Sequence, residues 1–356
     1  MKKQKVYLTL QNGDVFEGYS FGAMGETIGE LVFTTGMVGY LETLTEPANY
    51  GQIVVQTFPL IGNYGVMKSD LESKKAWVSA YVVREVCEEP SNFRCEGDLD
   101  AFLKEQGIIG VYGVDTRQLT KVLRENGAMN AQITLKPLAD FEQMLSYQLH
   151  GAVAEVTTKA VETYGDDKAK YTVALWDFGA KNSTVKQLVE HGCKVYKVPA
   201  NYTAEQILAL SVDGVMLSDG PGDPMENTTI IKEIGKLVGK KPVFGVGLGH
   251  QMLAISFGSE VVKMRHGHRG GQPVKCHENG RVYISSQNHG FVVWNDDVKV
   301  GNINFTNAND GTCEGIDYPE YSAFSVQFNP ESCSAACEPN LLYEKFLKLM
   351  EEKQNA

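Results

Sequence analysis

The sequence contains 356 residues, of which 43% are hydrophobic, and its formal net charge at pH 7 is -11. This length suffices for two domains with buried cores, and the acidic balance argues against a nucleic-acid partner, because phosphate backbones attract basic surfaces. The sequence has no apolar stretch of signal-peptide or membrane-span length, so we expect a soluble, cytoplasmic protein with no membrane partner.

The first part of the chain, residues 1–154, predicts a mixed α/β domain that opens with a β-hairpin. Two alternating runs within 6–16 flank the pair Asn12 and Gly13, a strong short-range hairpin signal. A helix is predicted to run from Asp115, as its N-cap, to a stop at Gly127. The other elements expected in this part are strands at 30–35, 52–58 and 76–86 and a helix at 98–105.

Residues 155–170 are polar, charged and poor in large apolar side chains, which predicts a linker. In residues 171–356 apolar strands alternate with amphipathic helices. Such alternation predicts a mainly parallel sheet flanked by helices, with ligands bound at the carboxyl ends of its strands. The elements expected here are strands at 171–176, 193–198, 214–217, 261–263, 281–285, 291–294 and 323–328, and helices at 181–190, 204–210 and 341–351.

The stretch 242–251 reads as a buried strand, a glycine-rich turn and a helix. This is the geometry of a nucleophile elbow, in which the tip residue exposes its side chain and neighbouring amides can hold an oxyanion. Here the tip residue is Gly247, which accepts positive φ but has no side chain for covalent chemistry. The sequence therefore predicts an elbow without a nucleophile.

Two other interpretations of these residues are weaker. The run 245–249 is similar to a dinucleotide-binding fingerprint, but its sixth position is His250 and no acidic residue follows at the expected distance. The seven cysteines are scattered, which predicts reduced thiols, and the close pair Cys333 and Cys337 lacks a second pair at zinc spacing. Metal ligation by His250, His266, His268 and His289 remains an alternative to structural hydrogen bonding, which we favour.

Several motifs together resemble known families. The second half resembles the class I glutamine amidotransferase domain, through GPGDP (220–224), GVGLGHQ (245–251), GHRGG (267–271), QNHGF (287–291) and NPE (329–331). The first half resembles the small subunit of carbamoyl-phosphate synthase, through FTTGMVGYLETLTEPANYGQIV, FPLIGNYG, SNFR and DTRQLTKVLRENGAMNAQI. The resemblance covers essentially the whole chain in order.

This resemblance implies an activity and its residues. In that family the small subunit hydrolyses glutamine through a Cys-His-Glu triad, and ammonia passes to a large, ATP-using subunit that makes carbamoyl phosphate for arginine and pyrimidine biosynthesis. At the matching positions this chain has Gly247 for the nucleophile, Asn329 for the base and Glu331 for the carboxylate. The oxyanion amides would come from Gly222 and Leu248. The groups that hold glutamine would be Gly220, Gly222, Leu248, Gln251, Asn288, Gly290 and Phe291, and a serine contact of the family falls at Ala48.

We therefore expect a pseudoenzyme, because glycine cannot attack an amide and an asparagine amide does not titrate near neutrality. The first hypothesis is a structural or regulatory small subunit that joins a large subunit in a heterodimer or higher oligomer of the ligase. L-Glutamine binding would be weak or lost, and ATP and Mg would be cofactors of the large subunit alone. The alternative is a stand-alone protein that binds or senses glutamine or another amino acid. Deliberate inactivation is disfavoured, because two engineered changes would not require Ala48.

Overall fold

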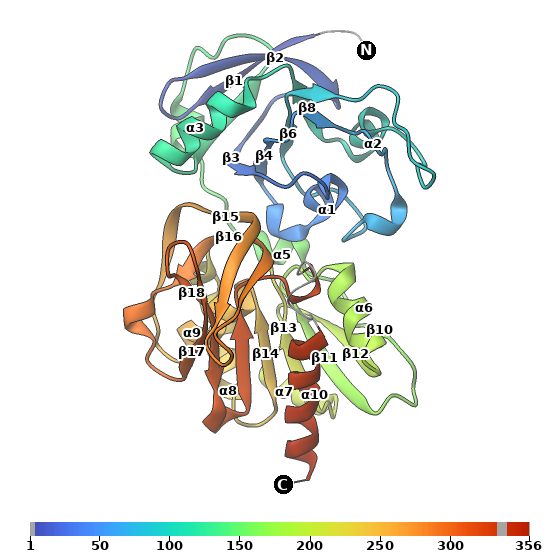
Figure 1. Cartoon of the computed structure of the whole chain (residues 1–356), viewed down its shortest axis with the longest axis vertical. Coiled ribbons are helices and arrows are strands. Elements are labelled where there is room, and N and C mark those ends of the chain that lie inside the picture. The colour runs from blue at the N-terminus through green and yellow to red at the C-terminus, as the bar shows by residue number, and fades with distance from the viewer. Residues whose placement is uncertain (1–3, 333–339, 356) are drawn as a thin grey trace. The chain divides into compact units, whose positions relative to one another are not determined.

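The structure of the protein is a computed structural model that describes residues 4–332 and 340–355. Its internal contacts divide the chain into two compact units, Met1–His150 and Gly151–Ala356 (Figure 1). Cys333 and Cys337 lie outside the described residues, so their predicted lack of a metal role stays a prediction.

The first unit is a mixed α/β domain, as predicted. Its strands are β1 (Lys5–Leu10), β2 (Val15–Gly22), β3 (Thr27–Thr34), β4 (Gln52–Gln56), β5 (Leu60–Ile61), β6 (Ala80–Val82), β7 (Glu85–Val86), β8 (Ile109–Tyr112) and β9 (Met129–Thr134). Its helices are α1 (Tyr40–Thr45), α2 (Leu99–Gln106), α3 (Thr116–Asn126) and α4 (Glu142–Ser146), with 3-10 turns η1 (Pro47–Asn49) and η2 (Lys68–Asp70).

A closed β-barrel forms the centre of this unit. Its strands pair in the order β1-β2-β8-β6-β4-β3-β9, and β9 pairs back onto β1. Successive side chains of a strand point to opposite faces, so Ile53 and Val55 of β4 join one core with Leu119 of α3, whereas Val54 joins another with Leu103 of α2. The sequence predicted strands and helices here but not the closure of the barrel.

The hairpin and the long helix of the first unit follow from local chemistry. Gly13 has φ 92°, which glycine accepts without strain, and the Asn12 side chain accepts a hydrogen bond from the backbone N–H of Asp14 at 3.0 Å. Asp115 caps α3 by accepting from the N–H of Gln118 at 3.0 Å. Both predicted elements are therefore present in the structure.

The second unit contains a large sheet with helices on both faces. Its strands are β10 (Glu162–Tyr164), β11 (Tyr171–Asp177), β12 (Cys193–Pro199), β13 (Gly214–Leu217), β14 (Val243–Val246), β15 (Val261–Cys276), β16 (Val282–Val293), β17 (Asn302–Asn307), β18 (Cys313–Tyr318) and β19 (Ala323–Val326). Its helices are α5 (Ala152–Val156), α6 (Asn182–Glu190), α7 (Ala204–Ala209), α8 (Thr228–Leu237), α9 (Leu248–Ser256) and α10 (Asn340–Gln354), with 3-10 turns η3 (Pro224–Asn227), η4 (Asn295–Asp297), η5 (Pro319–Tyr321) and η6 (Pro330–Ser332).

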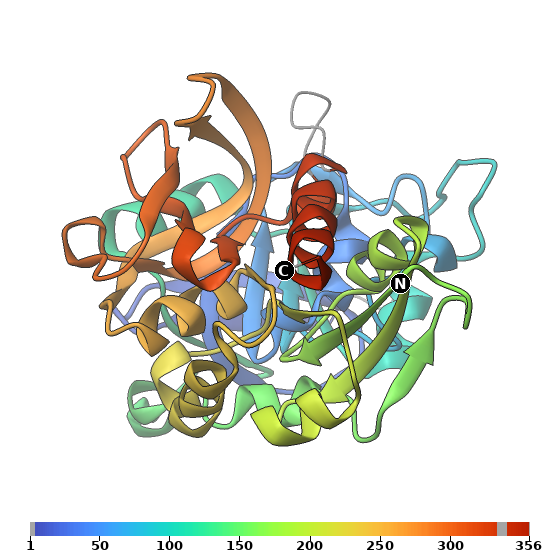
Figure 2. The ribbon, with the colours of Figure 1, turned by 90° about the horizontal axis from the view of Figure 1, so that it is seen from below.

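This sheet has the order β10-β12-β11-β13-β14-β19-β18-β17-β15-β16. The run from β12 to β19 is parallel, as predicted, and the flanking strands are antiparallel. Ala174 and Trp176 of β11 pack in a core with α7, α8 and α9, whereas Val173 and Leu175 pack in a core with α6 and α10. Figure 2 shows α10, in red, on one side of the sheet and the yellow helices on the other.

Some segments differ from the elements expected from sequence. The segment 155–170, predicted as a linker, contains the end of α5 and strand β10, which pairs with β12. The short strands expected at 261–263 and 291–294 are the ends of the long antiparallel hairpin β15–β16. Strands β17 and β18 were not predicted. Within residues 4–332 and 340–355, no helix combines the length and the apolarity that crossing a membrane requires.

Candidate active site

The predicted elbow lies between β14 and α9. Gly247 forms its tip with φ 54° and ψ -114°, a conformation that favours glycine. Its N–H donates to the carbonyl oxygen of Val326 at 3.0 Å, which ties the tip to the end of β19. Helix α9 packs so closely on β13 that a Cβ added at Gly249 would lie 2.4 Å from the carbonyl oxygen of Leu217. The turn is therefore held by its neighbours although no side chain stands at its tip.

The carboxylate of Asp219 occupies the space beside this tip. A Cβ added at Gly247 would lie 2.1 Å from Asp219 Oδ1 and 2.3 Å from its Cγ, far inside van der Waals contact. The same Oδ1 accepts hydrogen bonds from the N–H of Leu248 at 2.9 Å and from the N–H of Gly220 at 2.7 Å. An amide predicted to hold an oxyanion therefore already binds a carboxylate of the chain itself.

Sheet register explains why Asp219 and Gly247 meet. Leu217 of β13 pairs with Gly245 of β14, and the two strands are parallel. Asp219 and Gly247 each lie two residues beyond this pair, and the carboxyl ends of adjacent parallel strands share one edge of the sheet. The sequence prediction omitted Asp219, although a carboxylate two residues after a buried strand and directly before a glycine-rich turn was a usable signal.

The loop after β13 requires glycine at two positions, one because of a close backbone contact and the other because of a positive φ. A Cβ at Gly220 would lie 2.2 Å from the carbonyl oxygen of Phe178, so glycine alone fits this position. Gly222 has φ 89°, which also favours glycine. The conformation of this loop brings the N–H of Gly220 to Asp219, and a role of Gly220 and Gly222 in holding glutamine stays a prediction.

The remaining residues predicted to hold glutamine lie on α9 and β16. Gln251 Nε2 donates to the carbonyl oxygen of Phe291 and to Gln327 Oε1, both at 3.0 Å. The first bond joins the elbow helix to β16, which also carries Asn288 and Gly290, and the second joins it to the residue that follows β19. The structure thus brings Gln251 and Phe291 together, whereas their contact with glutamine stays a prediction.

Asn329 and Glu331 follow β19. Asn329 is buried, and its N–H donates to the carbonyl oxygen of Ser286 at 2.9 Å. Glu331 Oε1 lies 2.9 Å from Lys181 Nζ and accepts a hydrogen bond from Thr184 Oγ1, also at 2.9 Å. The side chains of the ion pair are 5% and 1% exposed, and buried charges of this kind are tolerated when they are paired. Glu331 is thus held by Lys181, which was predicted only as the first residue of a helix, and a role of Glu331 as orienting carboxylate stays a prediction.

Glu331 Oε2 has no hydrogen-bond partner among residues 4–332 and 340–355. A buried carboxylate oxygen without a partner is costly in free energy. The contacts with Lys181 and Thr184 therefore leave one acceptor oxygen of Glu331 without a hydrogen bond from a described residue.

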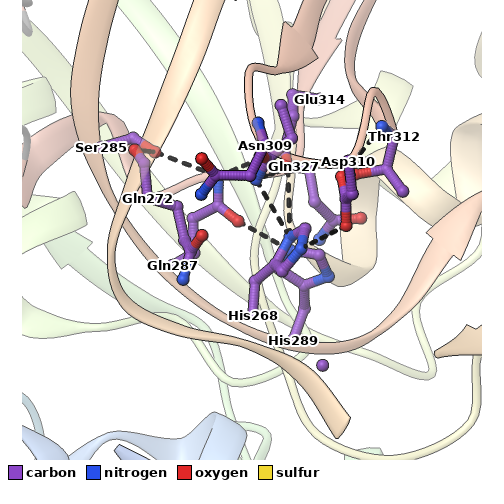
Figure 3. Close-up of polar contacts among 12 residues, drawn as sticks. His268, Gln272, Ser285, Gln287, His289, Asn309, Asp310, Thr312, Glu314 and Gln327 are labelled. Atoms are coloured by element: carbon purple, nitrogen blue, oxygen red, sulfur yellow. Dashed lines mark hydrogen bonds and ion pairs between the residues drawn. The ribbon is translucent and has the colours of Figure 1, made fainter. Parts of the chain in front are cut away.

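A polar cluster links β15, β16 and β18 (Figure 3). His268 Nε2 lies 2.9 Å from Asp310 Oδ2, and its Nδ1 lies 3.3 Å from Glu314 Oε1. Gln287 Nε2 donates to Glu314 Oε2 at 2.8 Å, and His289 Nε2 lies 2.9 Å from Gln287 Oε1. Burial alone would lower the pKa of His268, but hydrogen bonds and charges of the two carboxylates raise it above its usual value.

His268, His289 and Glu314 could hold a metal ion, because their ligand atoms lie within 4.8 Å of one another. Each of these side chains also has a hydrogen-bond or ion-pair partner in the protein. These contacts agree with structural hydrogen bonding as the role of the two histidines. The absence of a metal on this chain stays a prediction.

Ala48, at the position of the family's serine contact, lies in the first unit. It is half-buried on η1, between Pro47 and Asn49. Its methyl group cannot make the hydrogen bond that a serine hydroxyl makes. The loss of this contact to glutamine stays a prediction.

The elbow helix makes the stability of the protein depend on pH. Burial lowers the pKa of His250 to about 3 from its usual 6.5. Because the pKa of His250 is lower in the folded protein than in the unfolded chain, the unfolded chain gains a proton that the folded protein does not gain as the pH falls below 6.5. Protonation of the unfolded chain should therefore lower the free energy of unfolding by about 2 kcal/mol between pH 7 and pH 5.

Urea unfolding of the native protein and of His250→Gln at both pH values measures this effect. Between pH 7 and pH 5 the free energy of unfolding of the native protein should fall by about 2 kcal/mol more than that of His250→Gln. The matched control, His277→Gln at an exposed histidine, should show the same fall in the free energy of unfolding as the native protein. Equal pH dependence of the native protein and His250→Gln would contradict the prediction.

Comparisons with known proteins match both parts of the chain to described families. The family model described as carbamoyl-phosphate synthase small chain, CPSase domain, matches residues 8–133, and the model described as glutamine amidotransferase class-I matches residues 174–349. Several relatives carry the name carbamoyl phosphate synthase small chain, among them one from each of three genera. The one from Clostridium perfringens is 45% identical, over 97% of this chain and 99% of its own length. Those from Listeria monocytogenes (98% of each) and Bacillus anthracis (99% of this chain and 96% of the relative) are 43% identical.

Proposed function

Because the chain belongs to the family of carbamoyl-phosphate synthase small chains, we propose that it acts as a small subunit that does not hydrolyse glutamine. The elbow tip is the observation that supports the loss of glutamine hydrolysis. Gly247 supplies no nucleophile, and the carboxylate of Asp219 fills the space beside it. Acyl transfer by the family route needs a thiolate at this point and a titrating base beside it, and the base position holds Asn329.

The task that remains is structural or regulatory. The names of the relatives support a partnership with a large carbamoyl-phosphate synthase subunit. That partner would bind ATP and Mg and would use free ammonia, so this chain needs no cofactor of its own. The complex would work as a ligase in the cytoplasm, in arginine and pyrimidine biosynthesis. L-Glutamine would bind this chain weakly or not at all.

The test is complex formation followed by an assay with two nitrogen sources. The chain is co-expressed with the large subunit encoded in the same genome, and the purified material is examined by light scattering. We expect a complex that makes carbamoyl phosphate from ammonium, ATP and bicarbonate but not from glutamine. Ammonium-dependent turnover should differ from that of the large subunit alone, because a regulatory subunit changes its partner's rate or stability.

Recovery of this chain only as a monomer or a self-assembly would contradict the proposed partnership and would favour the stand-alone binding protein. Glutamine-dependent synthesis by the complex would contradict the loss of glutaminase activity. The two outcomes are separate, so each half of the proposal can fail alone.

A further inference from the structure

We propose that Asp219 is an internal ligand of the oxyanion amides and that it excludes the carboxamide of L-glutamine from the elbow. The proposal rests on the proposed function and deepens it, because it names the residue that closes the inactive site. It concerns ligand selection at the site and not the loss of the nucleophile.

The first step is the space that the side chain fills. A Cβ on Gly247 would lie 2.1 Å from Asp219 Oδ1, 2.3 Å from Cγ and 2.9 Å from Oδ2. Heavy atoms that are not bonded to each other do not approach so closely. The carboxylate therefore lies where a side chain at the elbow tip would begin. It can take this position only because residue 247 is a glycine.

The second step is the set of donors that hold it. Asp219 Oδ1 accepts from the N–H of Leu248 and from the N–H of Gly220, at 2.9 and 2.7 Å. Leu248 is the first residue of α9, so its N–H is one of the helix donors without an intrahelical partner. A carboxylate at a helix N-terminus is stabilised by such N–H groups and by the helix dipole. Hydrogen bonds to an ionised acceptor are also the strong ones.

The third step is the rigidity of the frame around the carboxylate. Gly220 lies so close to Phe178, and Gly249 so close to Leu217, that a methyl group fits at neither glycine. The hydroxyl of Ser218 donates to the carbonyl oxygen of Asp219 at 2.8 Å, which fixes the backbone of the loop. Loop and helix are thus held together, and the carboxylate stays in place beside the N–H groups of Gly220 and Leu248.

The consequence is direct competition with a substrate amide. A glutamine carboxamide in the elbow would need the N–H of Leu248 for its oxygen and the space beside Gly247 for its carbon. Asp219 takes both. Because the competing carboxylate is tethered to the site, its effective concentration is high, and glutamine must displace it before it can bind.

Calorimetry with L-glutamine tests the exclusion. We compare the native chain with Asp219→Ala, Asp219→Asn and the matched control Asp223→Asn, whose carboxylate accepts from Met225 within its own turn. Asp219→Ala should bind L-glutamine between about 10- and 100-fold more tightly than the native chain, because one charge-assisted hydrogen bond no longer has to be displaced. Asp219→Asn should lie between the two, and Asp223→Asn should match the native chain.

A second measurement reports the internal bond itself. In ¹H–¹⁵N spectra the amide proton of Leu248 should move upfield in Asp219→Ala and Asp219→Asn, because the ionised acceptor is gone, and should stay in place in Asp223→Asn. An unchanged Leu248 resonance would overturn the internal ligand. Equal glutamine affinity of the native chain and Asp219→Ala, including no binding by either, would overturn the exclusion. These measurements involve neither glutamate release nor complex formation, so their failure would leave the proposed function standing.

Discussion

Purified protein incubated with L-glutamine is expected to release glutamate no faster than glutamine breaks down spontaneously. The chain lacks the nucleophile at Gly247 and the base at Asn329, and the members of such a triad act as a unit. Loss of either the nucleophile or the base of a catalytic triad already lowers turnover on the order of 10^6-fold. The residual catalysis that an oxyanion hole supplies is also blocked here, because the N–H of Leu248 binds Asp219.

Cys193 and Cys313 are not expected to substitute for the missing nucleophile. Cys193 and Cys313 are buried, and burial raises the pKa of each thiol to about 12. Thiols with such pKa values are not ionised near neutrality, and the thiolate is the nucleophilic form. Neither Cys193, on β12, nor Cys313, on β18, lies on the elbow.

A coupled glutamate dehydrogenase assay measures the release. Heat-denatured protein and buffer give the background rate, and the same protein tested with ammonium in its synthetase complex shows that the preparation is folded. Glutamate release above background that disappears when one identified residue is replaced would contradict the prediction.

Restoring activity should require removal of Asp219 as well as return of the triad. In Gly247→Cys alone, the new Cβ would lie 2.1 Å from Asp219 Oδ1, and a non-glycine residue at this φ costs about 1 to 3 kcal/mol. The thiol would also have an ordinary pKa of about 8.5 with no imidazole to take its proton. A neighbouring carboxylate raises a thiol pKa further. We expect this variant to be inactive and less stable than the native chain.

The double variant Gly247→Cys with Asn329→His should also be inactive, because the Asp219 carboxylate and the new cysteine side chain compete for the same space beside the elbow. Adding Asp219→Ala should give glutamate release well above background, with Glu331 Oε2 available to orient the new histidine. Adding Ala48→Ser should lower the glutamine concentration that half-saturates the enzyme, because one hydrogen bond contributes about 0.5 to 1.5 kcal/mol.

Two controls accompany the series. Asp219→Ala alone should stay inactive, since it adds no nucleophile, and Glu331→Gln in the active variant should lower its rate. Equal activity of the double and the triple variants would show that Asp219 does not obstruct the site. Equal activity of Gly247→Cys and the triple variant would show that Asn329 is not at the base position.

Regular local signals made the fold class predictable. The capped helix α3 and the alternation of strands and helices from β11 to β14 each follow from the spacing of apolar residues and from capping or turn residues. The barrel closure was not predictable in this way, because pairing of β9 with β1 joins residues far apart in the sequence. Strands β17 and β18 were missed since polar residues interrupt them, as at Asn304 and Asp317, which hydrogen-bond to each other.

The candidate site was predictable only where a motif marks a backbone position. The tip at Gly247 followed from the strand-turn-helix pattern, and Glu331 from the resemblance. Asp219 and Lys181 were missed, because their roles depend on the groups that the sheet brings beside them. Leu248 donates to Asp219, and Lys181 pairs with Glu331 across a distance that no local pattern encodes.

The closed barrel of the first unit limits how any partner can recognise it. β9 pairs with both β1 and β3, so the barrel strands offer no free row of backbone donors and acceptors. A partner cannot extend this sheet by strand addition, and the same closure protects the barrel against edge-to-edge aggregation. Recognition of the barrel must therefore rely on side chains, and four large apolar ones are exposed on the described loops of this unit: Met24 (59%), Met37 (69%), Val38 (74%) and Phe93 (96%).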